Sequence, residues 1–254
     1  MPVVPSSSAA LSLVVPTFNE RERLAHLVHA LFHAYSAAGI AGEIVIVDDN
    51  SPDGTGEIAD DLARQYPITV LHRPGKQGLG TAVVAGFAAA SAPVVGVIDA
   101  DLSHPPDMPP RMLAVMNRTR ADIVIGSRYI PGGGTRNWPM VRILMSRLAC
   151  LAARSLTPVA DVTSGLFLIR RDLACAVRIS AGGFKIGLEL LVRGRPASIV
   201  EVPYVFSDRA AGESKMSTKE ALGYITQLRD LRRFQRAHPP LRQTYRRIAP
   251  DDFR

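Results

Sequence analysis

The sequence has little cysteine and few aromatic residues. Its 254 residues include two cysteines, Cys150 and Cys175, and no C-x-x-C pair. This excludes a disulfide-stabilised scaffold and a zinc site built on paired cysteines, and it fits a reducing, cytoplasmic compartment. Aromatic residues make up 6% of the chain. That is poor material for a surface on which nucleic-acid bases stack.

Long apolar runs are also missing. The longest uncharged stretch, residues 77–98, is interrupted by Pro93, whereas a membrane helix needs about 20 predominantly apolar residues. No basic residue precedes the first apolar run at the N-terminus, which argues against a secretory signal peptide. We therefore expect neither a leader nor a membrane span.

Hydrophobic residues make up 47% of the chain and charged residues 21%, as in ordinary globular proteins. The net charge of +7 is concentrated at one end, because the segment Leu228–Arg254 carries eight arginines and three aspartates. Such a segment suits an anionic surface, either lipid head groups or nucleic acid.

Short runs rich in Val and Ile alternate with helical patterns over the first half of the chain. The predicted strands are Leu11–Val15, Glu43–Asp48, Ile68–Leu71, Val94–Ile98 and Asp122–Ile125, followed later by Thr163–Ile169 and Ser198–Pro203. Most of them are apolar on both faces, which is typical of parallel strands covered by helices on both sides. We predict one α/β domain over residues 11–231, between an N-terminal tail, residues 1–10, and a basic C-terminal tail, residues 232–254. Beyond Pro239 and Pro240 we expect a loosely ordered segment.

The strongest chemical signal is a pair of acids, Asp99 and Asp101, directly after the strand Val94–Ile98. Ligands of open α/β sheets bind beyond the carboxyl ends of the strands. Two carboxylates at this spacing can converge on one cation, and Mg²⁺ prefers one or two carboxylates together with substrate phosphates. Aspartate at a strand end is also ordinary turn chemistry, so the pair taken alone leaves both interpretations open.

Two further strand ends are polar in the same way. The second strand ends in Asp48 and Asp49, ahead of the turn sequence Ser51–Gly54, and the first ends in the segment Pro16–Glu20. Parallel strands present these ends at one edge of the sheet. Three acidic strand ends therefore favour a ligand site.

The order of these motifs resembles the family 2 glycosyltransferases of the GT-A (Rossmann-like) fold, and among them the polyprenol-phosphate (dolichol-phosphate) mannosyltransferases. The motifs are PTFNE (16–20), VDDNSPDGT (47–55), GLGTA (78–82), DADLSH (99–104), GSRY (126–129), GGGTRNWP (132–139), DVTSGLF (161–167) and FSDRAAGESKM (206–216). Each piece is weak alone, but their joint order is specific and covers most of the chain.

The resemblance implies an inverting transfer of mannose from GDP-mannose to a polyprenyl (dolichyl-type) phosphate, assisted by Mg²⁺ or Mn²⁺ and giving polyprenyl-phosphate-mannose and GDP. By motif match, the nucleoside pocket would be lined by Pro16, Phe18, Glu20, Val47 and Asp49. The metal and the diphosphate would be held by Asp99, Ala100 and Asp101, with Ser103 where some relatives have Gln. The phosphates would be handled by Arg128, Arg142, Arg209 and Lys215. Within this set the catalytic roles would go to Asp101, Arg128 and Arg209, and Lys215 would also contact the donor.

Elementary chemistry agrees with that implication. A diphosphate leaving group needs a metal and Arg or Lys to balance its developing charge, and the planar fork of Arg matches phosphate oxygens. A lipid phosphate is already an anionic nucleophile, so no strong general base is required. Only His104 lies near the acidic loop as a candidate base.

Several alternatives remain open at this stage. The motifs do not fix the base or the sugar of the donor, so UDP-glucose or another nucleotide sugar is the first alternative. A basic nucleic-acid-binding module is an alternative of another class. A dinucleotide-binding oxidoreductase is disfavoured because the first strand lacks the glycine fingerprint. We expect a protein peripheral to the inner face of a membrane, held by its basic tail on anionic lipid or by a membrane-protein partner, and not bound to nucleic acid.

Overall fold

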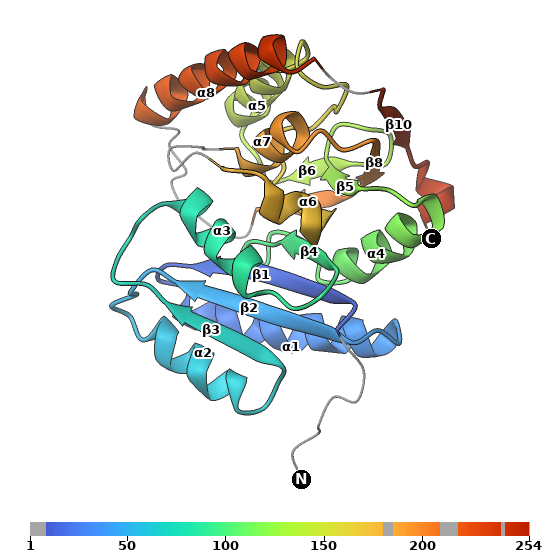
Figure 1. Ribbon diagram of the computed structural model, residues 1–254. Coiled ribbons are helices and arrows are strands. Elements are labelled where there is room, and N and C mark those ends of the chain that lie inside the picture. Colours follow the sequence, from blue (N-terminus) through green and yellow to red (C-terminus); the bar gives the residue numbers. More distant parts are fainter. Residues whose placement is uncertain (1–8, 180–184, 209–217, 240–241, 254) are drawn as a thin grey trace.

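A mostly parallel sheet runs through the centre of the computed structural model, which describes residues 9–179, 185–208, 218–239 and 242–253 (Figure 1). Its strands are β1 (Leu11–Thr17), β2 (Gly42–Asp48), β3 (Ile68–His72), β4 (Val94–Val97), β5 (Ile123–Ser127), β7 (Phe167–Arg170), β8 (Ser198–Pro203) and β10 (Thr244–Arg247), in the order β10-β8-β5-β7-β4-β1-β2-β3. Only β7, among these strands, runs antiparallel to its neighbours β4 and β5. A small second sheet pairs β6 (Gly134–Arg136) with β9 (Val205–Ser207).

Helices cover both faces of the large sheet, as the apolar pattern of the strands predicts. Leu13 and Val15 of β1 point into one core cluster and Val14, between them, points into the other. The first cluster takes residues from α1 (Arg21–Ala37), α2 (Thr55–Ala63), α4 (Met108–Thr119) and the C-terminal 3₁₀ helix Pro250–Phe253. The second takes residues from α3 (Leu79–Ala89), α5 (Met140–Ala152), α6 (Arg171–Ala176), α7 (Ile186–Arg193) and α8 (Thr218–Ala237). Of the described helices, none combines the length and the apolar character needed to cross a membrane.

The sequence-based prediction is wrong for the C-terminal segment. Residues Thr244–Arg247 are not loosely ordered but pair in parallel with β8, and Phe253 is buried in the first core cluster. The backbone carbonyl of Phe253 accepts a hydrogen bond from Arg111. The expected boundary after Leu231 lies inside α8, which continues to Ala237.

The topology brings the ends of seven strands to one edge of the sheet. All strands of the large sheet except β7 run in the same direction. The segments that follow β1, β2, β4 and β5 carry most of the residues singled out in the sequence. The candidate site therefore lies at this edge.

The packing of α3 on β1 leaves no room for a side chain at Gly86. A Cβ atom there would lie 2.4 Å from Cγ1 of Val14, and Val14 is fully buried and stiff. Although Ala is the better helix former by about 1 kcal/mol, overpacking costs about 1–3 kcal/mol. We expect Gly86→Ala to lower the free energy of unfolding in urea by about 1 kcal/mol.

Gly75→Ala is the matched control, because a Cβ atom at Gly75 would meet nothing within 4 Å. Equal unfolding midpoints for the two variants would show that the contact with Val14 is not tight.

Candidate active site

The loop after β4 holds Asp99 against a buried histidine. Nε2 of His104 lies 3.1 Å from Oδ2 of Asp99, and the imidazole is fully buried between the rings of Tyr204 and Phe206. Burial opposes ionisation of Asp99, but the hydrogen bond from His104 and the charges of His104, Lys185 and Arg128 outweigh it and lower the pKa of Asp99. His104 is thus placed to orient an ionised Asp99.

Asp101 is presented by a tight turn. Its Oδ1 accepts the backbone N–H of Ser103 at 2.9 Å, and Leu102 between them has a φ of 62°. The side chain of Ser103 is buried. The backbone carbonyl of Ser103 accepts the N–H of Ser207, which connects the loop to β9. Ala100 packs into the first core cluster, so the two carboxylates flank a fixed residue.

A divalent cation fits this pair only with help from the substrate. Among the described residues, no group of three His, Cys, Asp or Glu side chains could hold a metal ion. Two carboxylates completed by phosphate oxygens are nevertheless an arrangement that Mg²⁺ favours. Asp99 and Asp101 are therefore the residues that would hold such an ion here.

The end of β1 contributes Pro16, Phe18 and Glu20. The ring of Phe18 is 37% exposed, and Nζ of Lys76 lies 4.4 Å from its centroid. Burial raises the pKa of Glu20; repulsion from Asp101 and Asp99 adds to this, against the attraction of Arg23. The end of β1 and the acidic loop after β4 therefore interact electrostatically.

The end of β2 is held by side-chain contacts to two neighbouring segments. Oδ1 of Asp49 lies 2.7 Å from Nε of Arg73, and both side chains are nearly buried. Oδ1 of Asp48 accepts a hydrogen bond from Thr17 Oγ1 at 3.0 Å. The side chain of Val47 packs into the second core cluster, below the strand end. Nothing in the sequence linked Arg73 to Asp49.

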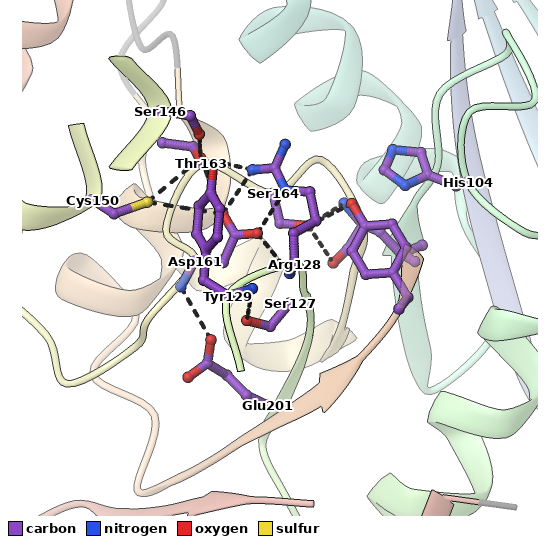
Figure 2. A network of polar contacts seen from close by, with 12 residues as sticks. His104, Ser127, Arg128, Tyr129, Ser146, Cys150, Asp161, Thr163, Ser164 and Glu201 are labelled. Carbon is purple, nitrogen blue, oxygen red and sulfur yellow. Dashed lines mark hydrogen bonds and ion pairs between the residues drawn. The ribbon is translucent and has the colours of Figure 1, made fainter. Parts of the chain in front are cut away.

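The basic side of the site is centred on Arg128, which follows β5 (Figure 2). Its Nε donates to Oδ2 of Asp161 and its Nη2 to Oδ1 of Asp161, both at 2.7 Å. The Arg128 backbone N–H donates to Oδ2 of Asp161 at 3.0 Å, and Nη2 also donates to Thr163 at 2.8 Å. The side chains of Arg128 and Asp161 are 5% and 0% exposed. The sequence placed Arg128 in the site but did not reveal its partner.

Arg142, on α5, lies against the same aromatic ring as Arg128. Cζ of Arg142 lies 4.0 Å from the Trp138 ring and Cζ of Arg128 lies 4.9 Å from it. Arg142 also forms an ion pair with Asp208. The structure thus brings together two of the four predicted phosphate-handling residues, while Arg209 and Lys215 lie outside the described residues.

Lys185 is a further basic residue that sequence reasoning missed. It directly precedes α7. Burial lowers its pKa, and Arg128 adds to this, while Asp99 and Asp161 oppose it. A lone lysine ahead of an apolar helix gives no signal in the sequence, and only the fold places it beside both charged halves of the site.

Comparison with known proteins identifies the family. The sequence profile described as glycosyl transferase family 2 matches residues 12–176. The chain belongs to glycosyltransferase family 2. The match spans β1 to α6 and so includes the acidic loop, Arg128 and Asp161.

Two relatives within this family are about equally similar to the chain. A dolichol-phosphate mannosyltransferase of Pyrococcus furiosus is 40% identical over 229 residues, which are 89% of this chain and 64% of that protein. The chain thus spans less than two thirds of that relative. A polyprenol monophosphomannose synthase of Mycolicibacterium smegmatis is 40% identical over 217 residues, 81% of this chain and 80% of that protein.

Solved structures of glycosyltransferases share the fold. A mannosyltransferase from Pyrobaculum calidifontis, solved in complex with GDP-Man and Mn²⁺, superposes with a TM-score of 0.60 at 17% identity, covering 83% of this chain and 59% of that one. This likeness establishes the GT-A fold predicted from the motifs.

The buried pair makes Asp161 a sensitive position in this family 2 domain. Asp161→Asn leaves the Arg128 charge without its counter-ion, and breaking a buried pair costs about 3–5 kcal/mol. We expect a loss of that order in the free energy of unfolding, measured by urea denaturation.

Asp61→Asn is the control, because Asp61 pairs with Arg64 on the surface with both side chains largely exposed. Such a pair contributes about 0–1 kcal/mol. Similar losses for the two variants would contradict the importance of the Arg128–Asp161 pair.

Proposed function

We propose that the chain transfers mannose from GDP-mannose to the phosphate of a polyprenyl (dolichyl-type) lipid, with inversion, giving polyprenyl-phosphate-mannose and GDP. The observation that carries the proposal is the similarity to two relatives, both 40% identical, that are named for this chemistry. The geometry supports it, because an acidic pair and a basic cluster meet at the edge of the sheet where a diphosphate and a phosphate would have to meet.

The donor would bind along the ends of β1, β2 and β4. Pro16, Phe18, Glu20 and Asp49 would line the nucleoside pocket, and Asp99 and Asp101 would hold Mg²⁺ or Mn²⁺ against the diphosphate. The ion would neutralise the leaving group. His104 supports this role by keeping Asp99 oriented and ionised.

The acceptor phosphate would approach from the basic side. Arg128 and Arg142 stand there with fixed guanidinium planes, and we assign Arg209 and Lys215 to the same task from their motif. Because the attacking oxygen is already anionic, none of these residues has to remove a proton. A single in-line attack inverts the anomeric carbon.

The proposal is tested by transfer of labelled mannose from GDP-mannose to polyprenyl phosphate, with Mg²⁺, with Mn²⁺ and with EDTA. We expect a metal-dependent lipid product, and a loss on the order of 10²–10³-fold in kcat for Asp101→Asn, comparable with the loss of one charge-stabilising group. Asp107→Asn is the control, since Asp107 lies after the loop and pairs with Arg111 on the surface.

Donor competition decides between nucleotide sugars. Product from UDP-glucose but not from GDP-mannose would keep the mechanism and overturn the mannose assignment. No product from any donor would overturn transfer by this chain alone and would favour a requirement for a membrane-protein partner.

We further propose that the protein lies on the inner face of a membrane through α5 and α8. These helices pack side by side (Figure 1), with Tyr224 Oη donating to the Ala149 carbonyl at 2.8 Å. The outer face of α5 is apolar and exposed, and α8 extends it; the residues are Met140, Val141, Leu144, Met145, Leu148 and Leu151 of α5 with Leu222 and Ile225 of α8. We call these eight residues the apolar face.

Charge complementarity selects an anionic bilayer as the partner of the apolar face. From Ala221 to Ala237, α8 carries four arginines and one aspartate. Basic residues near an anionic membrane contribute about 1 kcal/mol each, and buried Leu or Met side chains about 1.5–3 kcal/mol each. This surface adds an apolar contact to the basic tail, which we expected from the sequence to hold the protein on anionic lipid.

We expect the double variant Leu144→Asp/Leu148→Asp to lose co-sedimentation with vesicles containing phosphatidylglycerol. It should also lose transfer to a long-chain acceptor in those vesicles, but keep transfer to a short, water-soluble prenyl phosphate. Val84→Asp is the control, because Val84 is exposed on α3, outside the apolar face. Equal vesicle binding by both variants would contradict the docking surface, and binding to neutral vesicles alone would contradict the role of the arginines.

A further inference from the structure

A fully buried carboxylate, Glu201, lies in β8 behind the basic side of the site. Its Oε1 accepts the backbone N–H of Asp161 at 3.1 Å, and its Oε2 accepts the backbone N–H of Ala160 at 2.9 Å. Figure 2 shows Glu201 reaching from its strand to the backbone of Asp161. Glu201 therefore fixes the loop that contains Asp161, the residue that pairs with Arg128.

The other side of Glu201 is held by the C-terminal strand. The hydroxyl of Tyr245, in β10, donates to Oε2 of Glu201, and Nε of Arg247 donates to the same hydroxyl at 2.7 Å. Burial and the neighbouring Glu201 carboxylate raise the pKa of Tyr245 to about 12. The phenol thus remains protonated and acts as a donor at neutral pH.

The same segment braces the site at a second point. A Cβ atom on Gly132 would lie 2.5 Å from Cγ of Pro250, so the C-terminal segment packs tightly on the loop ahead of β6. The segment is fastened in turn to α4, where Arg118 donates to the carbonyl of Asp252 at 3.0 Å. These contacts hold β10 in place relative to the site.

A continuous series of contacts thus runs from β10 to the guanidinium of Arg128. It passes from Tyr245 to Glu201, from Glu201 to the backbone of Asp161, and from the Asp161 carboxylate to Arg128. Burying a carboxylate costs several kcal/mol of lost hydration. Two backbone N–H groups could be satisfied by an uncharged acceptor without this cost. A buried side chain that accepts hydrogen bonds from the Asp161 loop and from β10 at once points to a role in fixing their relative geometry.

We propose that Glu201 is a positioning residue that couples the C-terminal strand to the Asp161 loop and so sets the orientation of the Arg128 guanidinium. Its effect on the transfer reaction rests on the proposed function. Its effect on Arg128 itself does not.

A first test follows Arg128 without any substrate. Trp138 is the single tryptophan of the chain, and its ring lies 4.9 Å from Cζ of Arg128, so its fluorescence reports on the surroundings of that guanidinium. We expect Tyr245→Phe and Glu201→Gln to increase the quenching of Trp138 by acrylamide, at a temperature where circular dichroism shows both variants folded.

Thr244→Val is the matched control. It also removes one hydroxyl from β10, but Thr244 donates to the carbonyl of Ala197 and does not contact Glu201. It should leave the quenching unchanged. Wild-type quenching in Tyr245→Phe, which is the milder variant and keeps the ring, would overturn the proposal; so would an equal increase in Thr244→Val.

A second test separates positioning from general destabilisation. We expect Tyr245→Phe to lower kcat/KM for mannose transfer on the order of tenfold, since small displacements of a charge-stabilising group are costly. In an Arg128→Lys background the same change should have an effect of less than about twofold, because coupled residues are not additive. Losses that multiply would overturn a route through Arg128.

The two tests also separate this proposal from the proposed function. If wild type transfers no sugar from any donor, the proposed function fails. The quenching of Trp138 still decides whether Glu201 positions Arg128.

Discussion

The buried ion pair of Arg128 and Asp161 is the interaction on which the basic side of the site depends. Removing two charges from water costs several kcal/mol per ion, which is recovered only when the geometry is good and the remaining donors and acceptors are satisfied. Here both carboxylate oxygens are used by the guanidinium, and the Arg128 backbone and Thr163 complete the set. The pair therefore fixes the relative positions of the segments that contact it.

Helix α5 connects the surroundings of this ion pair to the surface of the molecule. On its inner side, Ser146 Oγ lies 3.0 Å from Thr163 Oγ1, and Cys150 packs against the same group. On its outer side lies the apolar face. Since a helix with its side chains is about 10–12 Å across, one element joins the charged site to the surface proposed for the membrane. A lipid phosphate held at that surface would need to travel only about the width of a helix.

The sequence predicts those parts of the fold that are determined by residues close together in the chain. β1, β2 and β4 are buried on both faces, so their apolar runs are visible without the structure. β10 has the sequence TYRR, and it forms a strand because it pairs with β8, forty-six positions away at Thr244 and Ser198. α4 carries Pro109 and Pro110, which resemble a helix breaker but lie in the first turn, where proline is tolerated.

The acidic ends of the site were predictable from their place after strands. Asp161, Arg73 and Lys185 were not, because their roles arise from partners distant in the sequence.

The antiparallel strand β7 explains why the acidic and basic halves meet at all. A strand that runs against β4 and β5 begins where they end, so the loop that precedes β7 lies at the same edge as the segments that follow β4 and β5. That loop places Asp161 against Arg128 at one end. At its other end, a Cβ atom on Gly165 would lie only 3.0 Å from Oδ2 of Asp99. A parallel strand in this position would present its beginning at the opposite edge, and neither contact would form. The single reversal in the sheet therefore supplies the connection between the carboxylates after β4 and the guanidinium after β5, which the proposed transfer reaction requires within one site.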